Sequence, residues 1–184
     1  MTQSEVASRF TRVQVWVHWS LALLVGGCLL TAAILSLGPL STAVGHRDVV
    51  GRVHVVAGLL LPLPIVLGLF SATFREDIER LNRFRPADWQ WLRSRDRRSG
   101  RIPVEKYNAG QKLNSAFTVG TILVMLGTGV IMRYLEGWPV FLRTGATWVH
   151  DWLAFFVLVV VIGHIWMARR WGQGGEQVRE SEVG

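Results

Sequence analysis

The chain has 184 residues, half of them hydrophobic, with 20 Lys and Arg against 13 Asp and Glu and a formal net charge of +7. Its length suits one domain, residues 1–184, and its apolar blocks joined by basic connectors exclude a uniformly mixed soluble protein. The basic residues lie close to the ends of the apolar blocks, so a membrane surface explains the charge better than nucleic acid does.

Four apolar blocks are each near the ~20 residues that a helix needs to cross a bilayer. The first is longer than the apolar core of a cleaved signal peptide and contains His18, so we interpret it as a retained span. The second contains Pro62 and Pro64, which a spanning helix tolerates as a kink. The sequence predicts an all-α membrane protein, an up-down bundle of four transmembrane helices at residues 13–37, 53–72, 114–133 and 147–168.

Basic residues are distributed unequally between the two sides that these spans define. Sixteen of the twenty Lys and Arg fall in residues 1–12, 71–115 and 168–184, which alternate to one side. The positive-inside rule then predicts a multi-pass protein of the bacterial cytoplasmic (inner) membrane, with both termini and the loop 75–112 in the cytoplasm. We interpret most of this loop as a solvated, partly helical connector.

Four of the five histidines fall in or beside the spans, at two depths. With alternating span directions, His18 and His164 lie towards the cytoplasmic side, and His54 and His150 lie towards the outer side. Ionisable side chains in hydrocarbon are expensive and usually functional. A lone histidine near a span end is more often an interfacial side chain, which is our interpretation of His46. The matched depths therefore predict two ligand pairs.

Two imidazoles at each depth restrict the metal centre that they can form. His150 and His164 are fourteen residues apart, which is about 21 Å along a helix, so the pairs cannot join in one tetrahedral zinc site. Two histidines on facing helices suit the axial positions of haem iron, whose macrocycle supplies the other ligands. Gly58, one turn after His54, leaves room for such a ring or simply packs as a small residue. We expect two stacked haems, with electrons crossing the membrane between them.

Several stretches resemble the γ (cytochrome b556) subunit of membrane-bound formate dehydrogenases. The most specific is the run KYNAGQK, and the resemblance covers nearly the whole chain. The wider group of two-haem cytochromes b, including hydrogenase cytochrome subunits, shares the histidine plan but not usually this run. The matching stretches are RFTRVQVWVHWS (9–20), GRVHVVAG (51–58), KYNAGQK (106–112), GTGVIMR (127–133) and HIWMA (164–168).

The resemblance implies a role for each histidine pair. His54 and His150 would ligate an outer haem b beside an iron–sulfur (β) subunit, which receives electrons from a molybdenum or tungsten catalytic (α) subunit. His18 and His164 would ligate an inner haem b. The short tail after Met167 and the compact outer loops depart from larger members of the family, so the docking partner can differ from the usual iron–sulfur subunit.

The resemblance also implies a menaquinone or ubiquinone site contacted by Asn108, Gly110 and His164. From the residues alone, Asn108 and Gln111 offer amide donors and acceptors for a quinone carbonyl. The same residues can equally form a polar helix start, with the asparagine as its cap. The resemblance favours the quinone site.

The sequence thus predicts a membrane cytochrome b subunit that relays electrons from an outer-side oxidoreductase through two haems b to the quinone pool. The resemblance favours formate dehydrogenase as this oxidoreductase. No residue pattern in this chain points to a centre that oxidises a substrate. One alternative is the equivalent subunit of a hydrogenase, a thiosulfate reductase or another oxidoreductase. A second alternative, less favoured than either electron-transfer subunit, is a haem-free membrane anchor or transporter.

Overall fold

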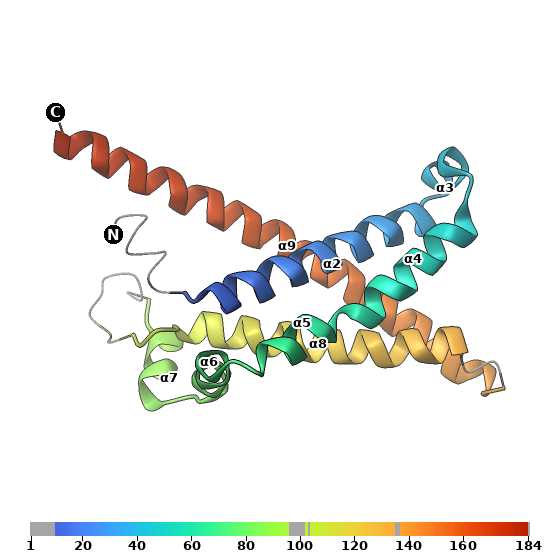
Figure 1. Ribbon diagram of the computed structural model, residues 1–184, viewed down its shortest axis with the longest axis horizontal. Coiled ribbons are helices and arrows are strands. Elements are labelled where there is room, and N and C mark those ends of the chain that lie inside the picture. Colours follow the sequence, from blue (N-terminus) through green and yellow to red (C-terminus); the bar gives the residue numbers. More distant parts are fainter. Residues whose placement is uncertain (1–9, 96–101, 103, 135–136, 184) are drawn as a thin grey trace.

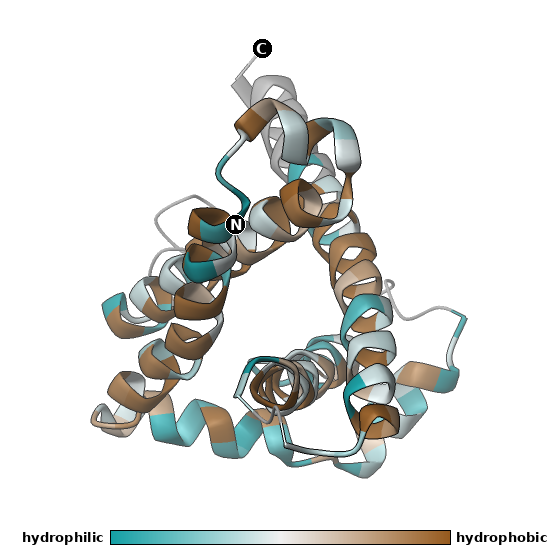
Figure 2. Ribbon diagram, turned by 90° about the vertical axis from the view of Figure 1, so that its right-hand side faces the viewer, coloured by the Kyte–Doolittle hydropathy of each residue, from teal (hydrophilic) through white to brown (hydrophobic). Residues whose placement is uncertain are grey.

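The computed structural model describes residues 10–95, 102, 104–134 and 137–183, and every regular element in these ranges is a helix. Four helical segments are long and apolar enough to cross a membrane: Arg12–Ser36, Arg47–Gly68, Ala109–Tyr134 and Val140–Arg169. Hydrophobic residues predominate along the long helices, as the brown segments of Figure 2 show. The predicted fold class, an all-α protein with four spanning helices, is confirmed.

Two helical hairpins make up the bundle (Figure 1). Helix α2 packs along α4 and α8 packs along α9, while a smaller contact joins α4 to α8. We call the end of the bundle that carries α6 and α7 the loop end, and the end that carries α3 the far end. In chain order the helices are α2 (Arg12–Ser36), α3 (Gly38–Val44), α4 (Arg47–Leu60), α5 (Pro62–Gly68), α6 (Ala72–Asn82), α7 (Pro86–Arg93), α8 (Ala109–Tyr134) and α9 (Val140–Val183).

The second span differs most from its predicted bounds. Its helix begins at Arg47 rather than at residue 53, because Asp48 and Arg52 pair across one turn at 3.0 Å and keep the charged start helical. The helix is interrupted between α4 and α5 at Pro62, which has no N–H to donate to the preceding turn. Instead the Leu61 N–H donates to the Gly58 carbonyl at 3.2 Å, which closes a tighter final turn.

The third and fourth helices also extend past the apolar residues that define their spans. Helix α8 begins at Ala109, inside the segment 75–112 that we interpreted as loop, and α9 runs from Val140 to Val183 rather than over 147–168. Hydropathy marks only the part of a helix that hydrocarbon can cover. Backbone hydrogen bonds continue a helix through polar turns, so the helix and the span end at different residues.

Glycine allows a close approach where three helices meet. A Cβ atom built at Gly68, the last residue of α5, would lie 2.7 Å from Cε1 of Phe74 and 3.0 Å from Cγ2 of Val17. Real Cβ atoms do not approach other carbons so closely, so glycine lets the end of α5 contact both α6 and α2. This contact holds α6 across the loop end of the first hairpin.

A buried carboxylate on α6 ties the loop end together. Asp77 is 3% exposed and accepts hydrogen bonds from Lys106 Nζ at 2.7 and 2.9 Å. Gln14, in the first turn of α2, also donates to Asp77. The Gln14 side chain completes a capping box with Thr11 at the start of the same helix. Asp77 therefore connects α6, the chain before α8 and the start of α2.

A second buried pair joins α7 to α8. Lys112 is 2% exposed, and its Nζ donates to Asp88 Oδ2 at 2.7 Å and to the Arg83 carbonyl at 2.9 Å. The Arg85 backbone N–H donates to the same carboxylate at 2.8 Å. Our interpretation of this loop as solvated is wrong at Asp77 and Asp88, because lysines compensate the cost of burying these carboxylates.

The ionisation of Asp88 depends on these partners. Burial on its own raises the pKa of Asp88, but the hydrogen bond from Lys112 and that from the Arg85 backbone outweigh it and hold the pKa below its ordinary value of 3.8. A depressed carboxyl pKa stabilises the fold above the pKa of the unfolded chain. That contribution is lost as the pH falls through the folded pKa.

We expect Lys112→Met to destabilise the chain by about 3 kcal/mol, because it leaves the Asp88 carboxylate buried without its cation. Adding Asp88→Asn should recover part of the loss, since a neutral amide still accepts from the Arg85 N–H. The free energy of unfolding in detergent measures both. Arg52→Met is the matched control: its partner Asp48 is 71% exposed, so its loss should cost under about 1 kcal/mol. Equal losses for Lys112→Met and Arg52→Met would contradict a structural role for the buried pair.

We expect the loop end to lose stability in acid, below about pH 4, where the unfolded-state carboxyl binds its proton. Thermal unfolding of the parent and of Asp88→Asn between pH 3 and pH 7 measures this. The parent should lose more stability than the variant over that interval, because the variant has no carboxylate to protonate at this position. Parallel profiles for the two proteins would argue against an ionised Asp88 in the folded chain.

Candidate functional site

The first histidine pair lies between the two hairpins towards the far end. His54 comes from α4 and His150 from α9, and their ring centroids are 6.2 Å apart with the rings inclined at 68°. Both side chains are half-buried. The main packing contacts among the described residues do not include α4 with α9. The two imidazoles therefore face each other from helices that do not pack closely along one another.

Threonine hydroxyls orient both rings of this pair. Thr31 Oγ1 lies 2.8 Å from Nδ1 of His54, and Thr128 Oγ1 lies 2.9 Å from Nδ1 of His150. Each hydroxyl also donates to a carbonyl four residues earlier in its own helix, at 2.7 Å for Thr31 and 2.9 Å for Thr128. Because its single proton goes to the carbonyl, each hydroxyl accepts from Nδ1–H of the histidine. Both rings then carry their lone pair on Nε2, the tautomer that binds a metal through that atom.

The second pair lies towards the loop end. His18 comes from α2 and His164 from α9, with ring centroids 6.0 Å apart and the rings inclined at 56°. The His18 ring also contacts the neighbouring Trp19 ring edge-on, at 5.8 Å between centroids. Both histidines are more exposed than the far-end pair, and no side chain in the described part of the chain donates to or accepts from either ring. The structure thus brings the histidines together in the two expected pairs.

The geometry of both pairs fits two axial imidazoles on one metal ion. Nitrogens bound on opposite sides of a metal at about 2 Å place the two ring centres roughly 6 Å apart, as observed for each pair. Among the described residues no three His, Cys, Asp or Glu side chains cluster as a metal site. A porphyrin would supply the four further ligands of an iron held by two imidazoles. A Cβ built at Gly58, one turn from His54, would have no neighbour within 4 Å.

The predicted quinone residues lie at the loop end, where α8 begins. The Asn108 backbone N–H donates to Gln111 Oε1 at 2.9 Å, and the Gln111 N–H donates to Asn108 Oδ1 at 2.9 Å. This reciprocal pair caps α8, as one of our two interpretations predicts. A Cβ built at Gly110 would lie 3.3 Å from Asn108 Oδ1 and 3.4 Å from the Trp91 ring, so the glycine makes room for α7. Within the described residues no hydrogen bond or ring contact joins this group to His164.

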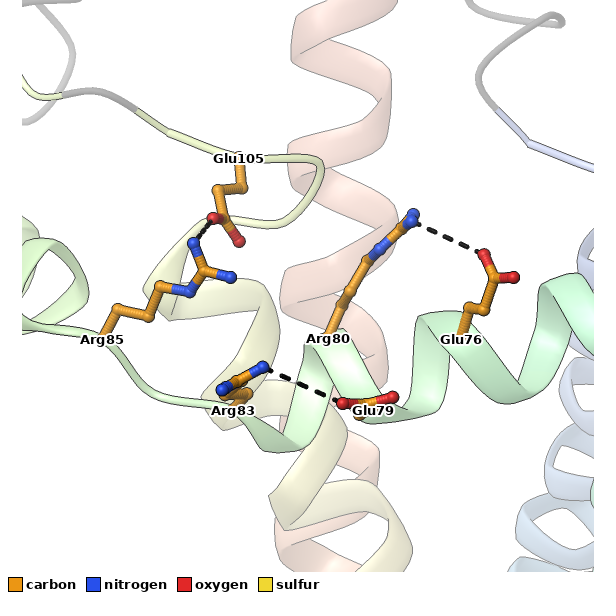
Figure 3. A pocket seen from close by; sticks show the side chains of 6 residues that line it. All are labelled: Glu76, Glu79, Arg80, Arg83, Arg85 and Glu105. Carbon is orange, nitrogen blue, oxygen red and sulfur yellow. Dashed lines mark hydrogen bonds and ion pairs between the residues drawn. The ribbon is translucent and has the colours of Figure 1, made fainter.

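His46, which we interpreted as an interfacial side chain, belongs to neither histidine pair. It is at the cap position of α4 and makes no side-chain cap bond. A pocket at the loop end is lined by three arginines and three glutamates that pair with one another (Figure 3). Its pairs are Arg80 with Glu76, Arg83 with Glu79 and Arg85 with Glu105. Because its cations are already paired with carboxylates, this pocket is a poor anion site.

The sequence missed the two threonines. Each lies on the helix packed against its histidine's helix, 23 residues from the histidine for Thr31 and 22 for Thr128. A hydroxyl in the middle of an apolar span is the only signal in the sequence, and Thr118 gives the same signal but bonds only to the Asn114 carbonyl of its own helix. The partner of each hydroxyl therefore depends on the register of the hairpin.

Comparison with known proteins agrees with this site. The family model for prokaryotic cytochrome b561 matches residues 9–179, nearly the whole chain. No curated protein matches the chain by sequence. The resemblance to cytochromes b is confirmed at the level of the family, while the formate dehydrogenase γ subunit stays a prediction. Membership of this family implies that the chain binds b-type haem and is consistent with a role in electron transfer. The chain is a multi-pass membrane protein of the prokaryotic cytochrome b561 family.

Proposed function

We propose that the chain relays electrons across the membrane to the quinone pool, with one b-type haem held by His54 and His150 and another by His18 and His164. When bound, haem iron supplies reversible one-electron oxidation and reduction. The observation that carries the proposal is the pair of ring separations, 6.2 and 6.0 Å, each of which fits two axial ligands on one iron. Because α9 contributes to both pairs, at His150 and His164, the proposed sites lie at two depths along one helix.

The protein's contribution is to hold these ligands rigidly in an apolar surrounding. Each pair takes one histidine from α9 and one from the first hairpin, so neither hairpin can form a site alone. The apolar side chains that predominate along the spans would favour an apolar macrocycle between the hairpins. The relay therefore depends on how the two hairpins are docked.

We propose that the protein lies in the inner membrane and that its loop end is on the cytoplasmic side. Sixteen of the twenty Lys and Arg belong to the segments on this side of the spans, in line with the positive-inside rule. Electrons that travel from the far end to the loop end would then move against the membrane potential, at about 2.3 kcal/mol per 100 mV. The drop in redox free energy from donor to quinone must exceed this cost.

The run KYNAGQK at residues 106–112 supports formate dehydrogenase as the partner, through its iron–sulfur and molybdenum or tungsten subunits. A hydrogenase, a thiosulfate reductase or another oxidoreductase is the alternative, since the histidine plan alone does not distinguish these partners. Co-purification of the tagged chain from its own membranes separates them. A large molybdopterin subunit with formate activity supports the first, and a nickel–iron subunit supports the second.

We expect the purified parent protein to contain two haems b per chain by the pyridine haemochrome assay. His18→Ala, His54→Ala, His150→Ala and His164→Ala should each lose about one, because an axial site with one imidazole binds haem weakly. The double variant His54→Ala/His150→Ala should also retain about one, since both changes affect the same site.

His46→Ala is the matched control, because this histidine makes no side-chain bond at the cap of α4. It should keep two haems. If the parent protein, prepared from haem-replete cells, contains no haem, the proposed electron relay is contradicted. A parent with a single haem that survives the loss of His54 would remove the far-end site.

For the quinone site we expect Asn108→Ser to keep the cap of α8 but to slow haem reoxidation by a water-soluble quinone about tenfold, the effect of one lost hydrogen bond. The Asn108 and Gln111 amide oxygens serve the cap, so the amide nitrogens are the proposed donors to a quinone carbonyl. Stopped-flow absorbance of the reduced protein measures the rate. Thr118→Val, about three turns further along α8, is the control and should leave the rate unchanged. An unchanged rate in Asn108→Ser would leave Asn108 with the helix cap alone.

A further inference from the structure

The two hairpins contain the same polar contact. In each, a threonine on the first helix accepts from the Nδ1–H of a histidine on the second: Thr31 of α2 from His54 of α4, and Thr128 of α8 from His150 of α9. The distances differ by only 0.1 Å, at 2.8 and 2.9 Å. The two histidines then face each other between the hairpins. The far-end pair is therefore supported in the same way from both sides.

A threonine in a helix of this chain does not by itself imply such a role. Thr42, Thr118 and Thr147 also donate to the carbonyl four residues earlier, at 2.9, 2.8 and 3.0 Å, and bond to no ring. This local bond satisfies a hydroxyl in an apolar surrounding. Thr31 and Thr128 differ because they make a second bond, to an imidazole. Within the described residues, no threonine makes such a bond to either ring of the loop-end pair, His18 and His164.

We propose that Thr31 and Thr128 are positioning residues that lower the reduction potential of the haem at the far-end pair. The inference rests on the proposed function, because it requires haem at His54 and His150. A hydroxyl that accepts from Nδ1–H leaves more electron density on Nε2 and makes the imidazole a stronger donor. A stronger donor stabilises ferric iron over ferrous iron, so the potential falls.

The direction of this effect agrees with the proposed relay. Lowering the potential at the far end alone favours movement of an electron towards the loop-end pair, His18 and His164, which lacks such hydroxyls in the described part of the chain. The bond also fixes each ring in the Nδ1–H tautomer before haem binds, which reduces the entropy lost on ligation. The two threonines thus orient the ligands and bias the direction of transfer.

The test is a redox titration of purified holoprotein from Thr31→Val, Thr128→Val and the double variant. Valine keeps the shape of threonine and removes the hydroxyl. We expect two haems in each variant, with one midpoint potential shifted upwards, further in the double variant, and the other midpoint unmoved. The g-values of one low-spin ferric signal should change in step. The midpoint that moves must belong to the haem that is lost in His54→Ala.

Three comparisons separate tuning from general damage to the bundle. Thr31→Ser restores the hydroxyl and should restore the parent midpoint. Thr118→Val removes a hydroxyl of the same helix as Thr128 that touches no ring, and should move neither midpoint. If valine loses the far-end haem, Thr31→Cys and Thr128→Cys keep a side chain of similar size with a weaker acceptor, and should still shift the midpoint upwards.

Unmoved midpoints in the valine or cysteine variants would overturn the inference, as would a downward shift or equal shifts of both haems. These outcomes leave the proposed function intact, because the parent still holds two haems. A parent without haem at His54 and His150 fails the proposed function instead, and haem content of the parent distinguishes the two failures.

Discussion

Imidazole nitrogens in an apolar bundle need polar partners, and this requirement shapes the space between the two hairpins. At the far end, Nδ1 of each histidine is satisfied within its own hairpin by a threonine, so Nε2 is the nitrogen that remains available for a partner from outside that hairpin. Closing the hairpins onto each other would bury two such nitrogens without partners. The fold instead packs α2 with α4 and α8 with α9, and keeps contact between the hairpins small. A ligand that bonds to both nitrogens removes that cost.

The loop end holds the hairpins in register without filling this space. In the run KYNAGQK, Lys106 binds the Asp77 carboxylate and Lys112 binds the Asp88 carboxylate, while Asn108 and Gln111 cap α8. Each of these four side chains therefore has a contact within the chain. The run therefore has a structural role at the loop end, in addition to the quinone contact that we propose for Asn108.

Much of this architecture could be predicted from the sequence, because the signals are local. Hydropathy located four spans, and alternating span direction alone placed His18 with His164 and His54 with His150. The helix starts at Arg47 and Ala109 were missed because capping and ion pairs extend helices past the apolar residues. The buried carboxylates and the hydroxyls of Thr31 and Thr128 were missed because their partners are decided by tertiary register.

The two histidine pairs have the same ligand type but different surroundings. All four proposed ligands are imidazoles, so any difference in potential must come from their surroundings. The far-end pair is half-buried with both Nδ1 atoms bonded to hydroxyls. His18, in contrast, is more exposed and contacts Trp19, and it lies one turn after Gln14, which bonds to Asp77. Burial disfavours the extra charge of ferric iron and opposes the effect of the hydroxyls. The hydrogen bonds are the part of this balance that single residues, Thr31 and Thr128, set directly, so selection can adjust the far-end site through them without moving a ligand.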